Sequence, residues 1–177
     1  MTFESASTLQ IPTLYTVTAQ VGQHAPAFAA PAAFPNESPA APPRTVSLSD
    51  YAGRWLILVW YPNDFTFVCP TELTALSDRA DAFEELDAAL LGASTDSVFA
   101  HQAWMRTPRS ENGVAGVSFP LLADTTHRIA RSYGVLIESE GIALRGLFIV
   151  DPDGVLQGLQ SGGLCPSDWK PGQRTIG

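Results

Sequence analysis

The hydrophobic residues of this chain fall into short continuous runs that are separated by segments of helical periodicity. The first run, RWLILVWY at residues 54–61, is apolar, β-branched and aromatic, which is typical of a strand buried on both faces. Shorter runs at residues 90–94, 119–123 and 144–150 predict three further strands. Each is too short to be a helix of ordinary length.

Helical patterns fill the gaps between these runs. Residues 70–90 place an apolar residue at every third or fourth position, which predicts an amphipathic helix. Asp96 or Ser97 can cap a second helix that runs through Trp104, and residues 126–133 predict a third. Strands that alternate with helices indicate an α/β fold with a central sheet flanked by helices. Functional groups of such folds gather at the carboxyl ends of strands.

The chain of 177 residues fits one compact domain, for which we expect three parts. Residues 1–20 form a flexible leader, residues 21–151 the domain itself, and residues 152–177 a shortened C-terminal segment. Residues 25–44 are rich in alanine and proline, so they cannot form a continuous helix. We expect them to run over the surface in an extended conformation.

The charge balance narrows the possible partners. The chain has 10 basic and 18 acidic residues and a net charge of −8, with an isoelectric point near 4.7. This argues against nucleic acid or an anionic membrane surface as a partner. The first 20 residues lack a basic region followed by an apolar run, and the longest apolar run is too short to cross a bilayer. A cytoplasmic location is therefore expected.

The two cysteines, Cys69 and Cys165, are too few for a disulfide scaffold and cannot by themselves complete a zinc site. Cys69 follows a buried strand and precedes Pro70, a residue suited to the first turn of a helix. The free backbone N–H groups and the dipole of a helix start favour a thiolate, which is the nucleophilic form. The alternative is that Cys69 is a small buried hydrophobic residue. The strand–Cys-Pro–helix context favours the reactive cysteine.

The sequence YPNDFTFVCPTEL, residues 61–73, resembles the active-site motif of the typical two-cysteine peroxiredoxins, the AhpC-like branch. The pattern P-x-x-x-T-x-x-C falls on Pro62, Thr66 and Cys69. The similarity continues, in order, at residues 96–104, 120–124, 133–135, 141–151 and 164–172. The resemblance implies a thioredoxin-like fold with a central mixed sheet. It also implies an antioxidant thiol peroxidase that reduces hydrogen peroxide and organic hydroperoxides.

The resemblance assigns a role to each residue of the site. Cys69 is the peroxidatic cysteine, which attacks the peroxide and becomes a sulfenic acid. Thr66 positions the peroxide and the thiolate, while Pro62 shields the site from water. Arg145 lies beside the thiolate, where a permanently charged fork can stabilise negative charge on sulfur and on the leaving oxygen.

The resemblance also supplies the second half of the reaction. Cys165 is the resolving cysteine, which forms a disulfide with Cys69 that thioredoxin or a similar dithiol then reduces. Glu72 supports the site through hydrogen bonds. No cofactor and no metal is expected, and the partners are the peroxides, the dithiol reductant and further copies of the chain in a homodimer or larger homo-oligomer.

The C-terminal region departs from the family. Relatives continue after residue 151 with a strand, a loop that carries a second arginine, and a long helix before the resolving cysteine. We therefore expect an internal deletion in which Gly154 and Val155 are the start of the missing strand, or residues 155–160 the end of the missing helix. Arg174 is the next arginine after Arg145, so the second arginine is expected to be absent.

The deletion has three expected consequences. Dimerisation is weakened by loss of the edge strand, the thiolate at Cys69 is less well stabilised, and apolar core surface is left uncovered. The deletion also leaves open a function of another class. In this alternative the chain is a peroxide sensor or holdase that keeps the fold but turns over little or no peroxide.

Overall fold

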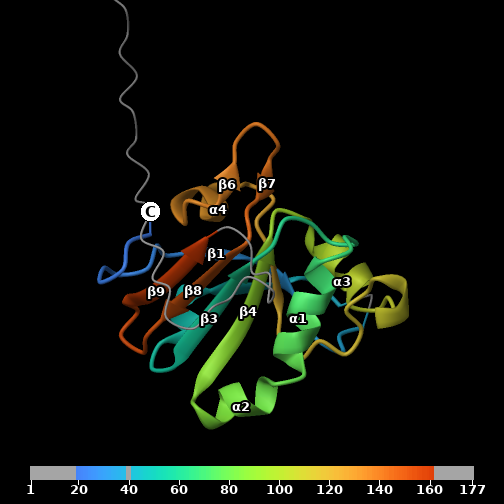
Figure 1. Cartoon of the computed structure of the whole chain (residues 1–177), viewed down its shortest axis with the longest axis horizontal. Coiled ribbons are helices and arrows are strands. Elements are labelled where there is room, and N and C mark those ends of the chain that lie inside the picture. Colours follow the sequence, from blue (N-terminus) through green and yellow to red (C-terminus); the bar gives the residue numbers. More distant parts are fainter. Residues whose placement is uncertain (1–18, 39–40, 162–177) are drawn as a thin grey trace, which may run out of the picture.

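A seven-stranded mixed sheet forms the centre of the computed structural model, which describes residues 19–38 and 41–161 (Figure 1). The strand order is β2-β1-β5-β4-β3-β8-β9. The three inner strands β3, β4 and β5 are parallel, and the other pairs are antiparallel. The strands are β1 (Ala29–Ala33), β2 (Arg44–Ser47), β3 (Trp55–Trp60), β4 (Ala88–Ser94), β5 (Leu121–Ala123), β8 (Gly146–Val150) and β9 (Leu156–Ser161).

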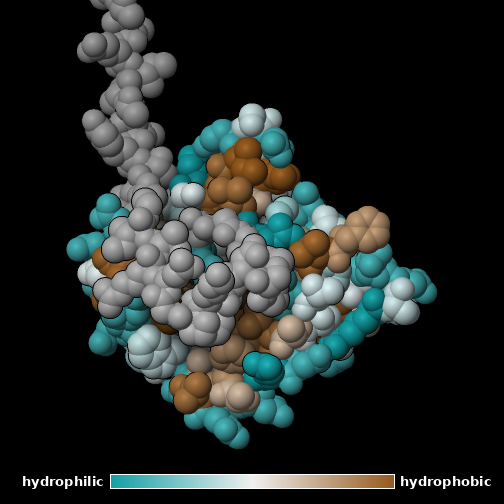
Figure 2. Space-filling view, in the orientation of Figure 1, coloured by the Kyte–Doolittle hydropathy of each residue, from teal (hydrophilic) through white to brown (hydrophobic). Residues whose placement is uncertain are grey.

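Short helices cover both faces of the sheet. Side chains of α1, α2 and α3 pack on one face, and those of α4 pack on the other. A small hairpin, β6–β7, projects from the end of the sheet and carries half-buried apolar residues, which form a brown patch in Figure 2. These elements are α1 (Cys69–Ser77), α2 (Ala80–Glu85), α3 (Val98–Trp104), α4 (Arg128–Ser132), β6 (Leu136–Ile137), β7 (Ile142–Ala143) and the 3-10 turns η1 (Leu48–Tyr51) and η2 (Arg109–Glu111).

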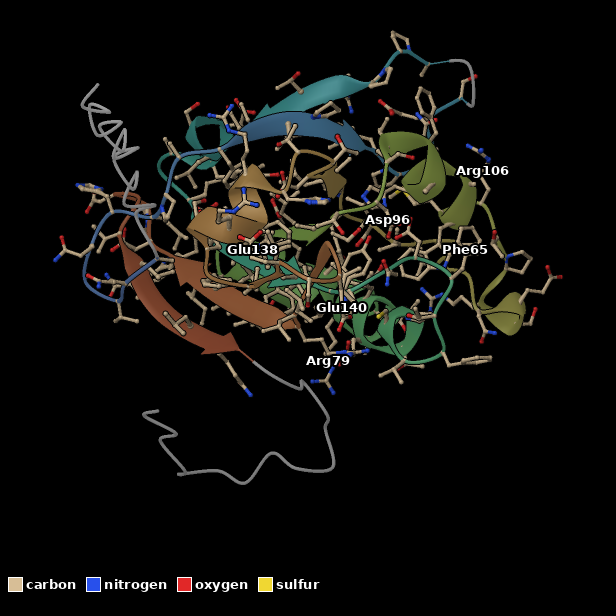
Figure 3. All side chains as sticks on the ribbon, turned by 90° about the horizontal axis from the view of Figure 1, so that it is seen from above. Phe65, Arg79, Asp96, Arg106, Glu138 and Glu140 are labelled. Carbon is tan, nitrogen blue, oxygen red and sulfur yellow. The ribbon has the colours of Figure 1, made fainter. Side chains whose placement is uncertain are left out.

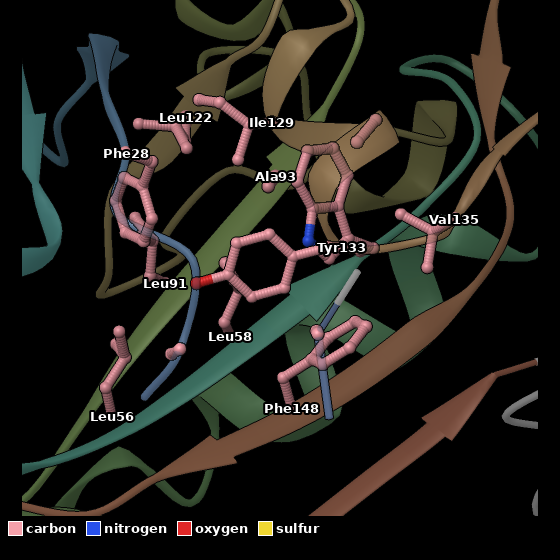
Figure 4. Close-up of a cluster of buried hydrophobic side chains, with 14 of the residues drawn as sticks. Phe28, Leu56, Leu58, Leu91, Ala93, Leu122, Ile129, Tyr133, Val135 and Phe148 are labelled. Carbon is pink, nitrogen blue, oxygen red and sulfur yellow. The ribbon is translucent and has the colours of Figure 1, made fainter. Parts of the chain in front are cut away.

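The apolar run of β3 supplies both hydrophobic cores, because successive side chains of a strand point to opposite faces. Leu58 and Trp60 join the core on the α4 face, where Tyr133 packs edge-on against Phe148 with ring centroids 5.0 Å apart (Figure 4). Val59 points to the other face, into the core that includes Cys69. The prediction of a strand buried on both faces is confirmed.

Two predicted elements differ from the structure. The helix predicted over residues 70–90 is two helices, since α1 ends at Ser77 and α2 at Glu85. Asp87 then adopts a left-handed φ of 52°, which turns the chain into β4, and Leu86 is left 71% exposed. The prediction of an extended surface segment over residues 25–44 is wrong for residues 29–33, while residues 35–38 and 41–44 are half-buried or exposed. Strand β1 lies inside the sheet between β2 and β5, and its alanines are small enough for close packing.

The C-terminal region adds a strand to the sheet. Residues 156–161 form the edge strand β9, which pairs with β8, so the main sheet extends beyond the expected boundary at residue 151. The expectation of a lost edge strand is therefore wrong, and residues 155–160 are not a helix end. Residues 1–18 and 162–177, including Cys165, lie outside the described residues. Within the described part of the chain, no helix is both long and apolar enough to cross a membrane.

Candidate active site

Cys69 lies where the sequence places it, at the start of a helix beside the carboxyl end of β3. The loop of residues 61–68 leads from β3 to α1, whose first residue is Cys69 and whose second is Pro70. Proline suits this position because the N–H that it lacks has no partner within a helix. The side chain of Cys69 is completely buried. The thiol is thus held in the interior, at the positive end of the helix dipole.

Arg145 brings a permanent positive charge to the sulfur. It lies between β7 and β8, and its Nη2 atom donates to Cys69 Sγ at 3.3 Å. Its Nε atom donates to Glu72 Oε2, in the first turn of α1, at 3.1 Å. One guanidinium therefore joins the thiol to a carboxylate. A charged donor at the sulfur is suited to stabilise a thiolate.

The carboxyl group of Glu72 is only partly satisfied. Burial raises its pKa, and the hydrogen bond and charge of Arg145 oppose that rise. Its second oxygen, Oε1, is buried and has no hydrogen-bond partner among the described residues. Unbonded buried oxygens are uncommon, and no second cation within residues 19–38 and 41–161 pairs with this one. The sequence likewise has no arginine between Arg145 and Arg174.

The two other motif residues lie in the loop that leads from β3 to Cys69. Pro62 and Thr66 are half-buried. Thr66 Oγ1 donates to the carbonyl oxygen of Asn63 at 3.2 Å, which closes a turn within the loop. The structure therefore joins Cys69, Arg145 and Glu72 directly. It places Pro62 and Thr66 in the loop that precedes Cys69. Cys165, the predicted resolving cysteine, lies outside the described residues.

A buried polar cluster that joins this loop to α3 was not predicted. It consists of Tyr61, Asp64 and His101, which we call the Asp64 cluster. Tyr61 Oη donates to Asp64 Oδ1 at 2.9 Å, and His101 Nδ1 lies 2.8 Å from Asp64 Oδ2. Burial raises the pKa of Asp64, against the opposing effect of His101. The sequence predicted only that His101 is a packed or surface residue, because no local pattern links positions 64 and 101.

The ionisable groups of the site do not form a metal centre. Among the described residues, no group of three or more His, Cys, Asp or Glu side chains could hold a metal ion. The site consists of a buried sulfur, a cation hydrogen-bonded to it, and the loop of residues 61–68 that leads into the helix of Cys69. On a mixed α/β sheet these features define the class of the protein, a thiol-based redox enzyme.

Comparisons with known proteins identify the family. Residues 21–158 match the AhpC/TSA family. The chain is 53% identical over 144 residues to the putative peroxiredoxin YkuU of Bacillus subtilis (strain 168), covering 70% of this chain and 80% of that protein. It is 45% identical over 183 residues to a thioredoxin peroxidase of Echinococcus granulosus, covering 89% and 92%. The reduced 2-Cys peroxiredoxin of Plasmodium vivax superposes with a TM-score of 0.74 at 38% identity, covering 80% and 85%.

The chain therefore belongs to the AhpC/TSA family and is a peroxiredoxin enzyme of the typical two-cysteine type. The thioredoxin-like fold implied by the sequence resemblance is confirmed.

Proposed function

We propose that this peroxiredoxin reduces hydrogen peroxide and organic hydroperoxides at Cys69. The observation that carries the proposal is the 3.3 Å contact between Arg145 Nη2 and the buried sulfur of Cys69. That contact places a guanidinium, which stays charged throughout the physiological pH range, within hydrogen-bond distance of the nucleophilic sulfur. The similarity to a protein named thioredoxin peroxidase supports the same activity.

The chemistry starts with attack of the Cys69 thiolate on one peroxide oxygen. The sulfur–oxygen bond forms as the oxygen–oxygen bond breaks, and the leaving oxygen takes up a proton to become water or an alcohol. Cys69 is oxidised to a sulfenic acid, and the peroxide is reduced. Arg145 stabilises the charge that moves to the leaving oxygen. Thr66 orients the peroxide and Pro62 keeps water away from the sulfur intermediate.

Cys165 completes the cycle in this proposal. Its thiol attacks the sulfenic sulfur, water leaves, and a Cys69–Cys165 disulfide forms, which a dithiol such as thioredoxin reduces by exchange. The register of β9 supports this role. Ser161, its last residue, pairs with Gly146, which directly follows Arg145. Four residues of extended chain span about 13 Å, so Cys165 can reach the neighbourhood of Cys69 within one chain.

Peroxide consumption with thioredoxin as the reductant tests the function. We expect turnover by the natural chain, none by Cys69→Ser, and a single oxidation without recycling by Cys165→Ser. Absence of turnover by the natural chain under these conditions would refute the proposal.

A mixture of the two single variants separates the two disulfide geometries. After peroxide treatment, a bridge between chains gives a covalent dimer of Cys69→Ser with Cys165→Ser, while a bridge within one chain gives none.

A sensor or holdase remains the second candidate, favoured by the unbonded oxygen of Glu72. The alignment with the Echinococcus protein also supports a shortened chain. It spans 183 positions, more than the 177 residues present, although it covers only 89% of them, so it contains gaps in this chain. Fast oxidation of Cys69 without recycling would support this candidate.

A homo-oligomer and a cytoplasmic location complete the proposal. The presence of β9 removes the main reason to expect a weakened dimer, which was the loss of an edge strand.

A further inference from the structure

Tyr61 of the Asp64 cluster packs in the same buried core as Cys69, yet the proposed chemistry uses none of the cluster's groups. The side chain of His101 is 0% exposed and that of Asp64 is 2% exposed. Burying ionisable groups costs free energy unless they are bonded to one another. We therefore expect the cluster to have a role that offsets this free-energy cost. Two of its three residues belong to the loop of residues 61–68, so that role concerns the loop.

The hydrogen bonds of the cluster require one shared proton. His101 Nε2 lies 3.2 Å from the carbonyl oxygen of Leu122, which can only accept, so Nε2 carries a hydrogen. His101 Nδ1 and Asp64 Oδ2, 2.8 Å apart, then need one proton between them, on either atom. The second oxygen of Asp64 accepts from Tyr61. With this proton in place, the pair is fully bonded.

Asp64 also fixes the backbone of the loop. Its N–H group donates to Asp96 Oδ2 at 2.8 Å, and Ser94 Oγ donates to the same oxygen at 3.1 Å. Asp64 is thereby tied to α3 through its side chain and to the end of β4 through its backbone. Figure 3 shows Asp96 and Phe65 on the side of the molecule where α3 lies.

The residue that follows Asp64 is strained. Phe65 has a φ of 56°, in the left-handed region that bulky side chains rarely adopt. Such a conformation persists only where the surroundings hold it. Phe65 packs against Trp104 of α3, with ring centroids 6.2 Å apart, but its side chain is 51% exposed. The stronger restraint is the bonded Asp64 immediately before it.

We propose that Asp64 and His101 are positioning residues, whose shared proton holds the loop of residues 61–68 in the strained conformation that keeps Cys69 buried against Arg145. This inference rests on the proposed function. Because Cys69 is completely buried and directly follows this loop, a second thiol reaches it only after a local opening, which release of the loop supplies. A bulky reagent needs a wider opening than hydrogen peroxide does. Loss of the shared proton therefore favours thiol exchange and disfavours the peroxide reaction.

The surroundings of the pair determine how it responds to pH. Tyr61 faces it from the loop, Asp96 from the β4–α3 connection, and β5 contributes the carbonyl group of Leu122. Burial also raises the pKa of Tyr61 well above its ordinary value, so the hydroxyl stays a donor. A rise in pH that removes the shared proton leaves His101 with one N–H for two contacts, Asp64 Oδ2 and the carbonyl oxygen of Leu122, so one of these hydrogen bonds is lost and the loop loosens.

The test uses the Cys165→Ser protein, in which Cys69 is the single cysteine. The rates of its reaction with hydrogen peroxide and with a bulky aromatic disulfide are measured from neutral to alkaline pH. In this background Asp64→Ala is expected to react about tenfold faster with the disulfide, since the restraint on the loop is lost, and more slowly with peroxide. Each variant's rate is divided by the parent's rate at the same pH. The pH dependence that Cys69 ionisation gives to both proteins then cancels from the comparison.

Asp64→Asn is the matched variant. Its amide can donate to His101 Nδ1 and accept from Tyr61, so it keeps the bonds without a proton that titrates. We expect parental rates near neutral pH and a smaller increase with the disulfide at alkaline pH. If Asp64→Ala does not fold, Tyr61→Phe, which removes one bond to Asp64, gives the same test with a smaller effect.

The outcomes separate the two proposals. Equal changes in both rates for Asp64→Ala, or an Asp64→Asn protein that behaves like Asp64→Ala, would overturn the positioning role. If hydrogen peroxide does not oxidise Cys69 in the parent while the disulfide arm follows the expected pattern, the proposed function fails and the positioning role stands.

Discussion

Two polar groups in the region of Cys69 differ in how completely their atoms are hydrogen-bonded. In one, Arg145 joins Cys69 to Glu72, whose second oxygen lacks a partner among the described residues, and Arg145 itself is 25% exposed. The other is the Asp64 cluster, in which both carboxylate oxygens and both ring nitrogens are bonded and buried. The Arg145–Glu72 group is charged and leaves one buried carboxylate oxygen without a hydrogen bond. In the Asp64 cluster, the carboxyl and imidazole groups make all their hydrogen bonds.

The difference separates two roles that one active site needs. Stabilising charge as it moves in a reaction requires a charged donor that is partly free to respond. Holding a strained loop requires buried polar groups with every bond made, because a single unbonded one costs about 1–3 kcal/mol. Substitutions in the two groups should therefore affect different quantities, mainly the rate in one group and the stability in the other.

The largest expected effect is on the rate, at Arg145. Arg145→Ala removes the cation from the sulfur and should slow the reaction of Cys69 with hydrogen peroxide by about a hundredfold or more. Stopped-flow measurement under single-turnover conditions gives this rate. Its free energy of unfolding should also fall, because Glu72 loses its partner, but by less than on loss of His101, since Arg145 is 25% exposed and water can reach the carboxyl group once the guanidinium is gone.

Arg131 provides the matched control for this prediction. It also forms an ion pair, with Glu138 at 2.6 Å, but on the surface and away from the sulfur. Arg131→Ala should leave the peroxide rate unchanged. Equal losses of rate in the two variants would show that net charge, rather than the contact with Cys69, is what matters.

The second prediction concerns stability, at His101. His101→Ala leaves the carboxyl group of Asp64 buried without its main partner and should lower the free energy of unfolding by about 3 kcal/mol. Urea unfolding measures this change. His24 is exposed, so His24→Ala should cost less than about 0.5 kcal/mol. If His101→Ala lowers the free energy of unfolding no more than His24→Ala does, the Asp64 cluster does not have the stabilising role that distinguishes it from the Arg145–Glu72 group.

The two groups also differ in how far the sequence predicted them. The helix start at Cys69 was predictable because its signals are local, a buried strand before it and Pro70 after it. Arg145 came from the resemblance alone, since its contact with Cys69 joins positions far apart in the chain. The Asp64–His101 contact was missed because a polar pair between a loop and a helix leaves no periodic trace in the sequence.

The sheet shows the same limit. Strand β3 was predicted from its continuous apolar run, but β1 was not, because alanines and a proline carry little hydrophobic signal. Ala32 and Ala33 are nevertheless completely buried, since a small side chain allows close approach of neighbouring elements. Burial of β1 depends on which strands lie next to it, and that follows from the topology rather than from local composition.

The smallest expected effect is a pH dependence at Glu72. Its pKa is raised in the folded protein, so the folded state binds the proton more tightly than the unfolded chain does. The contribution of Glu72 to stability is thus fully present below the pKa of the unfolded chain and is lost as the pH rises through the folded value. Glu72→Gln does not titrate, so the natural chain should lose stability relative to this variant over that rise.

Urea unfolding of the two proteins across mildly acidic pH checks this sign. A relative loss of stability with rising pH means that burial with one unbonded oxygen outweighs the ion pair with Arg145. A relative gain would mean the reverse. The ion pair with Arg145 would then offset the cost of burying Glu72, as in an ordinary surface ion pair. Glu72 would no longer differ from the fully hydrogen-bonded Asp64 cluster in this respect.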